Sequence, residues 1–309
     1  MRLLIALVIV FAALAAPASA SVGPCLPGGS RDGALCTFWT GKVTFVADGD
    51  TIDVDIAGDG TRRARRVRLT GFNAMELTRY SHTARLRRGD CHGVDATTRL
   101  EQLLRHGRMR VRLAAQDPAS MSGPRLRRQV SVRLGGQWVD VGRTMLAEGH
   151  ALWLPNGFEW AWNRDYADLS RLAAAAGLRL WNTQGCGSGP SPSAALSLHV
   201  NYDAKYNDRF NVNGEWAELH NDSSEAVRLD GWWFRDSALR RYTFQPGAVL
   251  PADGTLRLRM GYGTDTADEL HWGLDSPPFE NPSYDERATG DGGYLFDPRG
   301  NLRAWEIYN

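Results

Sequence analysis

Two kinds of hydrophobic periodicity divide the chain. Before residue 185, stretches that alternate apolar and polar residues are interspersed with stretches in which apolar residues recur every three or four positions. Period two is typical of half-buried strands, and the longer spacing is typical of amphipathic helices. Several strands with helices beside them predict a small barrel with packed helices. Strands are predicted over 42–47, 51–56, 66–72, 109–113 and 129–134, and helices over 96–104, 141–148 and 162–180.

After residue 193 only the two-residue period remains. Leu256 and Leu258 alternate with Arg257 and Arg259, and turn signals containing Gly and Pro separate such stretches. No helical face of any length is present, so the pattern predicts an all-β sandwich over 194–309. Residues 185–193 (GCGSGPSPS) are small and rich in helix and strand breakers, which predicts a linker with few contacts across it.

The first twenty residues have the pattern of a signal peptide. A basic start at Arg2 leads into an apolar run, which ends in the small residues Ala18-Ser19-Ala20. The run is short for a membrane span, so we expect cleavage and export, with a short N-terminal segment over 21–40. No later segment predicts a membrane crossing. The mature protein is expected to be secreted and monomeric, with surface attachment or a periplasmic location as alternatives.

Export makes disulfides the first interpretation of the four cysteines. Four cysteines allow three pairings. Proximity in sequence favours Cys25–Cys36, which leaves Cys91–Cys186. A four-cysteine metal site is the alternative, and the absence of any CxxC pair argues against it.

The charge of the chain is unevenly distributed. Residues 41–186 hold 23 Lys and Arg against 15 Asp and Glu, whereas residues 187–309 hold 11 against 19. The formal net charge of +1 therefore conceals a basic first domain and an acidic second one. Only the first is suited to bind a polyanion.

Oxygen-bearing and basic side chains gather within thirty residues of the first domain. The turn at 48–51 (DGDT) places two carboxylates at the tip of a predicted hairpin, and Arg68, Asn73 and Glu76 follow. A hard divalent cation prefers carboxylate, amide and carbonyl oxygens. Cleavage of a phosphodiester also needs a base for water and positive charge for the transition state. Each element alone is explained as well by a simple turn or a basic strand, but together they supply every part of such a site.

In this order the motifs resemble the staphylococcal nuclease family: DGDT at 48–51, VRL at 67–69, and NAME at 73–76 where that family has D-[AT]-P-E. The resemblance continues to about Trp181 and defines a domain over 41–184. It implies an OB-fold-type five-stranded barrel, Ca²⁺ dependence, and cleavage of DNA and RNA. It also implies that Asp50 is a calcium ligand, that Arg68 is a catalytic arginine, and that Glu76 is the general base.

The resemblance carries two departures at the expected cation site. Asn73 stands where the family has aspartate, so it keeps a ligating oxygen but lacks the charge. Ala74 is the residue expected to ligate through its backbone carbonyl. We therefore expect altered metal binding, with another divalent cation as an alternative to Ca²⁺, and we expect that Asn73→Asp would tighten Ca²⁺ binding.

The second catalytic arginine of the family opens a strand with the pattern R-x-hydrophobic-small. Arg128-Gln129-Val130-Ser131 fits this pattern, whereas taking Arg127 would place Gln129 at the apolar position. Arg128 is therefore the candidate. The alternative is that 125–128 is only a basic patch.

Residues 196–309 resemble the lamin tail domain, through the segments 213–221 (NGEWAELHN), 229–236 (LDGWWFRD) and 292–300 (GGYLFDPRG). The resemblance implies an immunoglobulin-like sandwich that attaches or positions the enzyme, with a cell-surface partner possible. The sequence thus predicts a mainly β protein with some α, and a secreted metal-dependent endonuclease. The alternatives are a catalytically weakened nucleic-acid-binding module and a surface adhesion protein.

Overall fold

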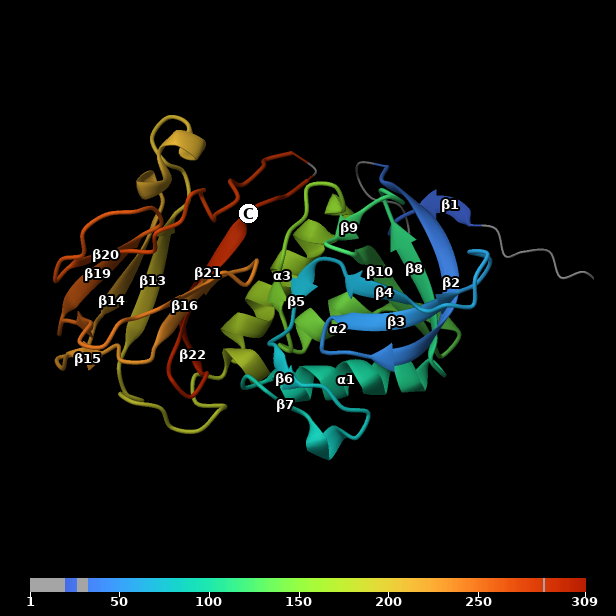
Figure 1. Cartoon of the computed structure of the whole chain (residues 1–309), viewed down its shortest axis with the longest axis horizontal. Coiled ribbons are helices and arrows are strands. Elements are labelled where there is room, and N and C mark those ends of the chain that lie inside the picture. Colours follow the sequence, from blue (N-terminus) through green and yellow to red (C-terminus); the bar gives the residue numbers. More distant parts are fainter. Residues whose placement is uncertain (1–19, 27–32, 286) are drawn as a thin grey trace, which may run out of the picture.

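A computed structural model describes residues 20–26, 33–285 and 287–309, so nearly all of the expected signal peptide lies outside the described part (Figure 1). Two units lie side by side. Residues up to about 184 form a barrel with helices on one flank, and residues from 196 form two packed sheets. The expected order of a barrel followed by a sandwich is confirmed.

Five strands close the barrel in the order β2-β3-β4-β10-β8, and β8 returns to β2. The β4–β10 pair is parallel and the other four pairs are antiparallel. This closed five-stranded barrel is compatible with an OB-type fold. The strands are β2 (Leu35–Val46), β3 (Thr51–Ile56), β4 (Arg65–Leu69), β8 (Arg110–Ala115) and β10 (Arg125–Leu134), extended by β1 (Ser21–Pro24), β9 (Met121–Ser122) and β11 (Gln137–Asp140).

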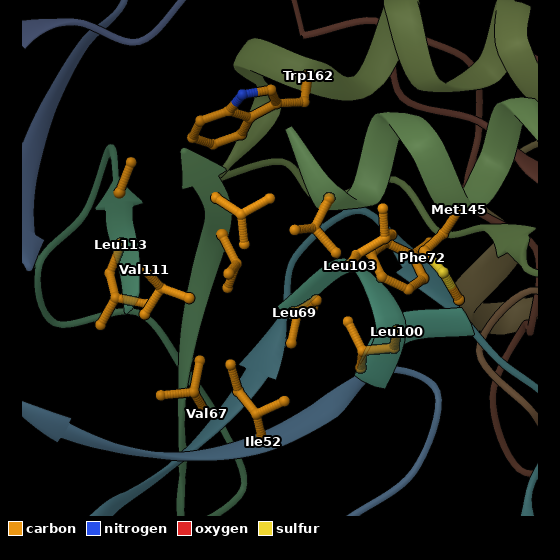
Figure 2. Packing of buried hydrophobic residues seen from close by; sticks show 14 of the residues in the cluster. Ile52, Val67, Leu69, Phe72, Leu100, Leu103, Val111, Leu113, Met145 and Trp162 are labelled. Atoms are coloured by element: carbon orange, nitrogen blue, oxygen red, sulfur yellow. The ribbon is translucent and has the colours of Figure 1, made fainter. Parts of the chain in front are cut away.

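Alternation along the strands builds the barrel core (Figure 2). Ile52, Val67, Leu69 and Leu113 are each 2% exposed or less, because every second side chain of a strand points inward. Helix α1 (Gly93–His106) adds Leu100, Leu103 and Leu104, at the spacing of one helical face. The helix predicted from that spacing is confirmed and is longer at both ends.

The single helix predicted over 162–180 is divided into two elements. Helix α3 (Asn163–Ala175) ends before Gly177, whose φ of +61° breaks the helix, and a separate turn η3 (Arg179–Trp181) follows. Leu172 lies within the helix predicted over 162–180 but is 67% exposed. The other helical elements are α2 (Val141–Ala147), η1 (Ala84–Leu86) and η2 (Trp160–Trp162).

Two small two-stranded sheets complete the first unit; one contains Asn73 and the other begins directly after Glu76. They pair β5 (Phe72–Asn73) with β12 (Leu152–Trp153), and β6 (Leu77–Arg79) with β7 (Arg88–Gly89).

The second unit is a sandwich of two four-stranded sheets around one apolar core. The alternation predicted at 256–259 is confirmed, since the apolar side chains there are buried and their neighbours are partly exposed, and residues 216–221 show the same pattern. The first sheet is β13 (Leu196–Asn201), β14 (Trp216–Asn221), β19 (Gly254–Arg259) and β20 (Glu269–His271). The second is β17 (Arg241–Thr243), β16 (Trp233–Asp236), β21 (Asp291–Phe296) and β22 (Leu302–Tyr308). Outside them lie β15 (Val227–Arg228), β18 (Val249–Leu250), η4 (Asp208–Phe210) and η5 (Val212–Gly214).

The second sheet is covered on both faces. One face contributes to the sandwich core, and the other packs on the end of the first unit, beside α3 (Figure 1). All six residues of β21 are buried as a result. The shared cluster joins Met75, Leu152, Ala173, Ala174, Leu180 and Trp181 to Trp233, Tyr294, Phe296 and Leu302.

The expectation of few contacts across the linker is therefore wrong. Arg303 donates to the carbonyl oxygens of Pro190 and Ser191, and Asn301 donates to that of Gly187. The linker is small and rich in breakers, but the sandwich supplies the hydrogen-bond partners that hold it. An apolar contact of this kind holds two domains in one arrangement.

Both expected disulfides, Cys25–Cys36 and Cys91–Cys186, are present. The second joins the start of α1 to the beginning of the linker. Within the described residues, no helix is long and apolar enough to cross a membrane.

The fold generates a prediction about Glu215, a fully buried residue of the sandwich. Burial raises the pKa of Glu215 to about 8, although its carboxylate accepts a hydrogen bond from the Phe279 amide. The folded state keeps the Glu215 proton up to a higher pH than the unfolded state does. The protonated side chain therefore makes its full contribution to the free energy of unfolding below about pH 4.5. This contribution falls by up to about 1.4 kcal/mol per pH unit as pH rises to about 8.

Glu215→Gln cannot titrate, so its stability should lack this component. Urea denaturation of both proteins from pH 5 to 9 measures the difference. Parallel pH curves for the two proteins would contradict the assignment.

Candidate active site

The turn between β2 and β3 holds two carboxylates in fixed positions. The Asp50 amide donates to Asp48 Oδ1 over 3.1 Å, which closes the turn. Gly49 is required there, since a Cβ would lie 2.5 Å from that of Ala74 and 2.9 Å from that of Ala96. Asp48 and Asp50 are 7% and 2% exposed. The predicted hairpin tip is therefore buried against α1 and the segment after β5.

The carboxylate of Asp50 joins three segments of the barrel. Its Oδ1 accepts from the Thr51 hydroxyl (2.9 Å) and pairs with Arg68 Nη1 (2.6 Å), and its Oδ2 accepts from the Ala74 amide (2.8 Å). Burial raises the pKa of Asp50 to about 7, Asp48 adds to the rise, and Arg68 opposes it. A buried carboxylate with a raised pKa is one whose charge the surroundings do not fully compensate.

Asn73 lies in β5, directly before Ala74, whose amide donates to Asp50. It is 2% exposed, its Nδ2 donates to the backbone carbonyl of Ser237, and its Oδ1 is buried without a partner among the described residues. A buried polar atom without a partner destabilises a fold by about 1–3 kcal/mol, so such an atom requires an explanation.

Glu76 is the accessible member of the group. Its backbone carbonyl accepts from the Asp90 amide, and Gly93 at the start of α1 lies so close that a Cβ would be 2.7 Å from this oxygen. The side chain is half-buried, and within the described residues its carboxylate has neither a hydrogen bond nor an ion pair. Burial raises the pKa of Glu76, with Asp48 adding and Arg68 opposing. A free carboxylate of raised pKa is suited to take a proton from water.

The structure does not bring Arg128 to this group. Its guanidinium donates to the carbonyl oxygens of Pro118 (2.7 Å) and Ser120 (3.2 Å) and lies over Trp39, 4.7 Å from the ring centre. In the parallel β4–β10 pair, Arg128 is in register with Leu69, whose side chain points into the core.

Arg127 is the arginine on the same face as Arg68. The two are register partners, and burial lowers the pKa of Arg127, with Arg68 contributing. The sequence pattern did not point to Arg127, because Gln129, which follows on the same face, was expected to be apolar. It is buried but satisfied, since its amide nitrogen donates to the Ser131 hydroxyl and the Val130 carbonyl.

Residues of the sandwich also reach this site. The guanidinium of Arg235, at 4% exposure, donates to Met75 Sδ over 3.3 Å. Its charge, like that of Arg68, opposes the rise in the pKa of Glu76. No sequence signal pointed to Arg235 or Ser237 as residues of this site, because Arg235 lies in a segment that resembles the lamin tail domain and Ser237 follows it.

Tyr80, beyond β6, is a further neighbour that the motifs missed. It is 51% exposed, and the carboxylates of Asp48, Glu76 and Asp50 help burial to raise its pKa. An exposed aromatic ring beside the site could stack on a nucleobase.

The residues present fit a divalent cation. Asp50 provides carboxylate oxygens with further lone pairs, and Asn73 Oδ1 is a buried oxygen without a partner among the described residues, next in the chain to the residue whose amide contacts Asp50. Ala74 follows Asn73, and its backbone donates to Asp50. Elsewhere in the described chain, the side chains of Cys91, His92 and Cys186 lie close enough together to hold a metal ion, but the two sulfurs are joined in a disulfide.

A hollow with basic side chains lies elsewhere on the barrel. It has a volume of about 880 Å³ and lies at the far end of β3, between β2, the end of α1 and the β10–β11 turn, and Lys42, Arg108 and Arg110 line it. Lys42 and Arg110 are opposite each other in register. This hollow shares no residue with the site, and its charge suits an anion.

A lamin tail domain model matches residues 191–309, which agrees with the resemblance found in the sequence. The C-terminal unit is therefore a lamin tail domain. No curated protein matches the chain. The staphylococcal nuclease resemblance stays a prediction.

The two neighbouring arginines should differ in their contribution to stability. Arg128→Ala removes the bonds to the carbonyl oxygens of Pro118 and Ser120 and the contact with Trp39, so we expect the free energy of unfolding to fall by about 2–3 kcal/mol. The side chain of Arg127 has no such partners among the described residues, so Arg127→Ala should change the free energy of unfolding by less than about 1 kcal/mol. Urea denaturation measures both, and equal losses would contradict the placement.

Proposed function

We propose that this protein is an exported, divalent-metal-dependent endonuclease that hydrolyses phosphodiester bonds of DNA and RNA. One observation carries the proposal. The buried carboxylate of Asp50 pairs with Arg68, the register partner of Arg127, and accepts from the amide of Ala74. The orphaned amide oxygen of Asn73 and the free carboxylate of Glu76 belong to residues close to Ala74 in the chain. The two disulfides support export, and the barrel supports nucleic-acid binding because it is compatible with an OB-type fold.

Asp50, the amide oxygen of Asn73 and the backbone carbonyl of Ala74 would hold the cation. When bound, Ca²⁺ or a similar ion would neutralise charge on the phosphate and bring it to the site. The proposed role of Asp48 is to hold the turn, through the hydrogen bond that it accepts from the Asp50 amide.

The chain's own side chains would perform the chemistry. Glu76 would take a proton from the attacking water, since its carboxylate is free and its pKa is raised. Arg68 and Arg127, side by side on β4 and β10, would stabilise the charge that develops on the phosphate oxygens. These three side chains would act on the attacking water and on the phosphate, which DNA and RNA have in common.

The second candidate is a module that binds nucleic acid without cleaving it. The ion pair between Arg68 and Asp50 favours this candidate, since Arg68 then occupies one of the two carboxylate oxygens that a cation would use. The surface adhesion alternative has less support, because it gives no role to the excess of basic side chains in the barrel.

Cleavage should require a divalent cation. Purified mature protein should cut plasmid DNA and single-stranded RNA with Ca²⁺, Mg²⁺ or Mn²⁺, and excess chelator should stop both reactions. Gel electrophoresis of the products measures this. Intact nucleic acid across the whole series, with binding retained in a filter assay, would favour the binding module instead.

Removing single side chains should separate the proposed roles. Glu76→Gln keeps the shape but removes the base, so we expect kcat to fall by about 10²- to 10⁴-fold with nucleic-acid binding retained. Arg127→Ala should lower kcat by about 10²-fold or more because it removes charge stabilisation. Asp59→Asn, an exposed carboxylate in the β3–β4 loop, is the matched control and should leave kcat unchanged. Near-parental rates for both site variants would refute the assignment.

A further inference from the structure

The lamin tail domain does more than adjoin the barrel, because its sheet ends at the candidate cation site. Strand β16 leads directly to Ser237, which is fully buried. The Ser237 amide donates to Asp291 Oδ1 over 3.1 Å, and its hydroxyl lies 3.3 Å from that of Tyr294. Both partners belong to β21, so two anchors within one sheet hold the Ser237 backbone.

That sheet cannot easily move relative to the barrel. Trp181 of the first unit contacts Trp305 edge-on, with ring centres 5.3 Å apart, and Trp233 stacks on Phe296 at 3.9 Å within the same cluster. Large buried aromatic side chains dominate the energy of such a contact. The carbonyl of Ser237 is therefore presented to the barrel in a fixed place.

This carbonyl determines which way the amide of Asn73 points. A carbonyl oxygen can only accept a hydrogen bond, so it selects Nδ2 of Asn73 and turns Oδ1 to the other side. Oδ1 then lies buried without a partner in the described structure. The contact between domains thus leaves an oxygen free in the segment where a cation is expected.

The same contact accounts for asparagine where the resembled family has aspartate. A carboxylate at position 73 would set an acceptor against the Ser237 carbonyl, both buried, and neither could donate. The gain from a second formal charge near the cation would be opposed by that repulsion. On this account Asn73→Asp should weaken Ca²⁺ binding, whereas the sequence alone led us to expect tighter binding.

We propose that the lamin tail domain completes the cation site, with the Ser237 carbonyl as the group that orients Asn73 as a neutral ligand. This inference rests on the cation site of the proposed function. Ser237 is a positioning residue, since it acts through Asn73. The two domains form one functional unit.

The test measures Ca²⁺ binding to the full mature chain by titration calorimetry, without nucleic acid. Asn73→Asp should bind Ca²⁺ at least tenfold more weakly than the parent. Thr78→Asp, on the exposed part of β6, is the matched control because it adds the same charge nearby without meeting Ser237. It should bind Ca²⁺ as well as the parent or better. Equal or tighter binding by Asn73→Asp, or no Ca²⁺ binding by the parent, would overturn the inference.

A thermal melt in chelator keeps the test independent of folding failure. Asn73→Asp should melt below the parent, in one transition that includes both domains. Unchanged melting, or two separate transitions in the parent, would contradict the coupling. The outcomes also separate the two proposals. A parent that binds Ca²⁺ but cuts nothing refutes the nuclease alone, whereas an active parent whose Asn73→Asp variant binds more tightly refutes the role of Ser237 alone.

Discussion

The carboxylate of Asp50 is the constraint on which the candidate site depends. A buried charge must be paired or it destabilises the fold by several kcal/mol, and Asp50 finds donors on three segments: its own turn, strand β4, and the chain after β5. Satisfying one carboxylate therefore brings Arg68, Asn73, Ala74 and Glu76 to the same place. The rise in the pKa of Asp50 indicates that these partners do not offset its burial fully, and a cation would supply the missing positive charge.

The same logic extends to the second domain. An exposed Asn73 could satisfy its amide with water, but the lamin tail domain covers it and replaces water by one carbonyl. Arg235 adds a buried positive charge near Glu76, which favours the ionised form of the base. The acidic balance of this domain makes it a poor surface for nucleic acid, yet its buried edge contributes polar groups to the site. Charge counting over whole domains does not detect a contribution of this kind.

Local pattern was enough for much of the fold. Alternation located the strands around Ile52 and Leu258, the three-to-four spacing located α1, and sequence proximity suggested the two disulfides that the structure contains. These features depend on neighbours in sequence. The order of the motifs likewise brought Asp50, Arg68, Asn73 and Glu76 together, although the activity that they imply stays a prediction.

Long-range packing explains what the sequence did not provide. Choosing Arg128 over Arg127 reversed the face of β10, because a one-residue change in a strand moves a side chain to the opposite side. The buried polar pair of Gln129 and Ser131 concealed the alternation that would have placed Arg127 on the face of Arg68. Composition predicted a linker with few contacts, because the local sequence does not show that Asn301 and Arg303 donate hydrogen bonds to its backbone.

A crystal structure of the full mature chain soaked in Mn²⁺ tests the central claim most directly, because the anomalous signal locates the ion itself. The account predicts one site between the carboxylate of Asp50, the amide oxygen of Asn73 and the carbonyl of Ala74, with Asn73 Nδ2 still on the carbonyl of Ser237. An ion bound elsewhere, no ion at this place, or an Asn73 turned away from Ser237 would contradict it.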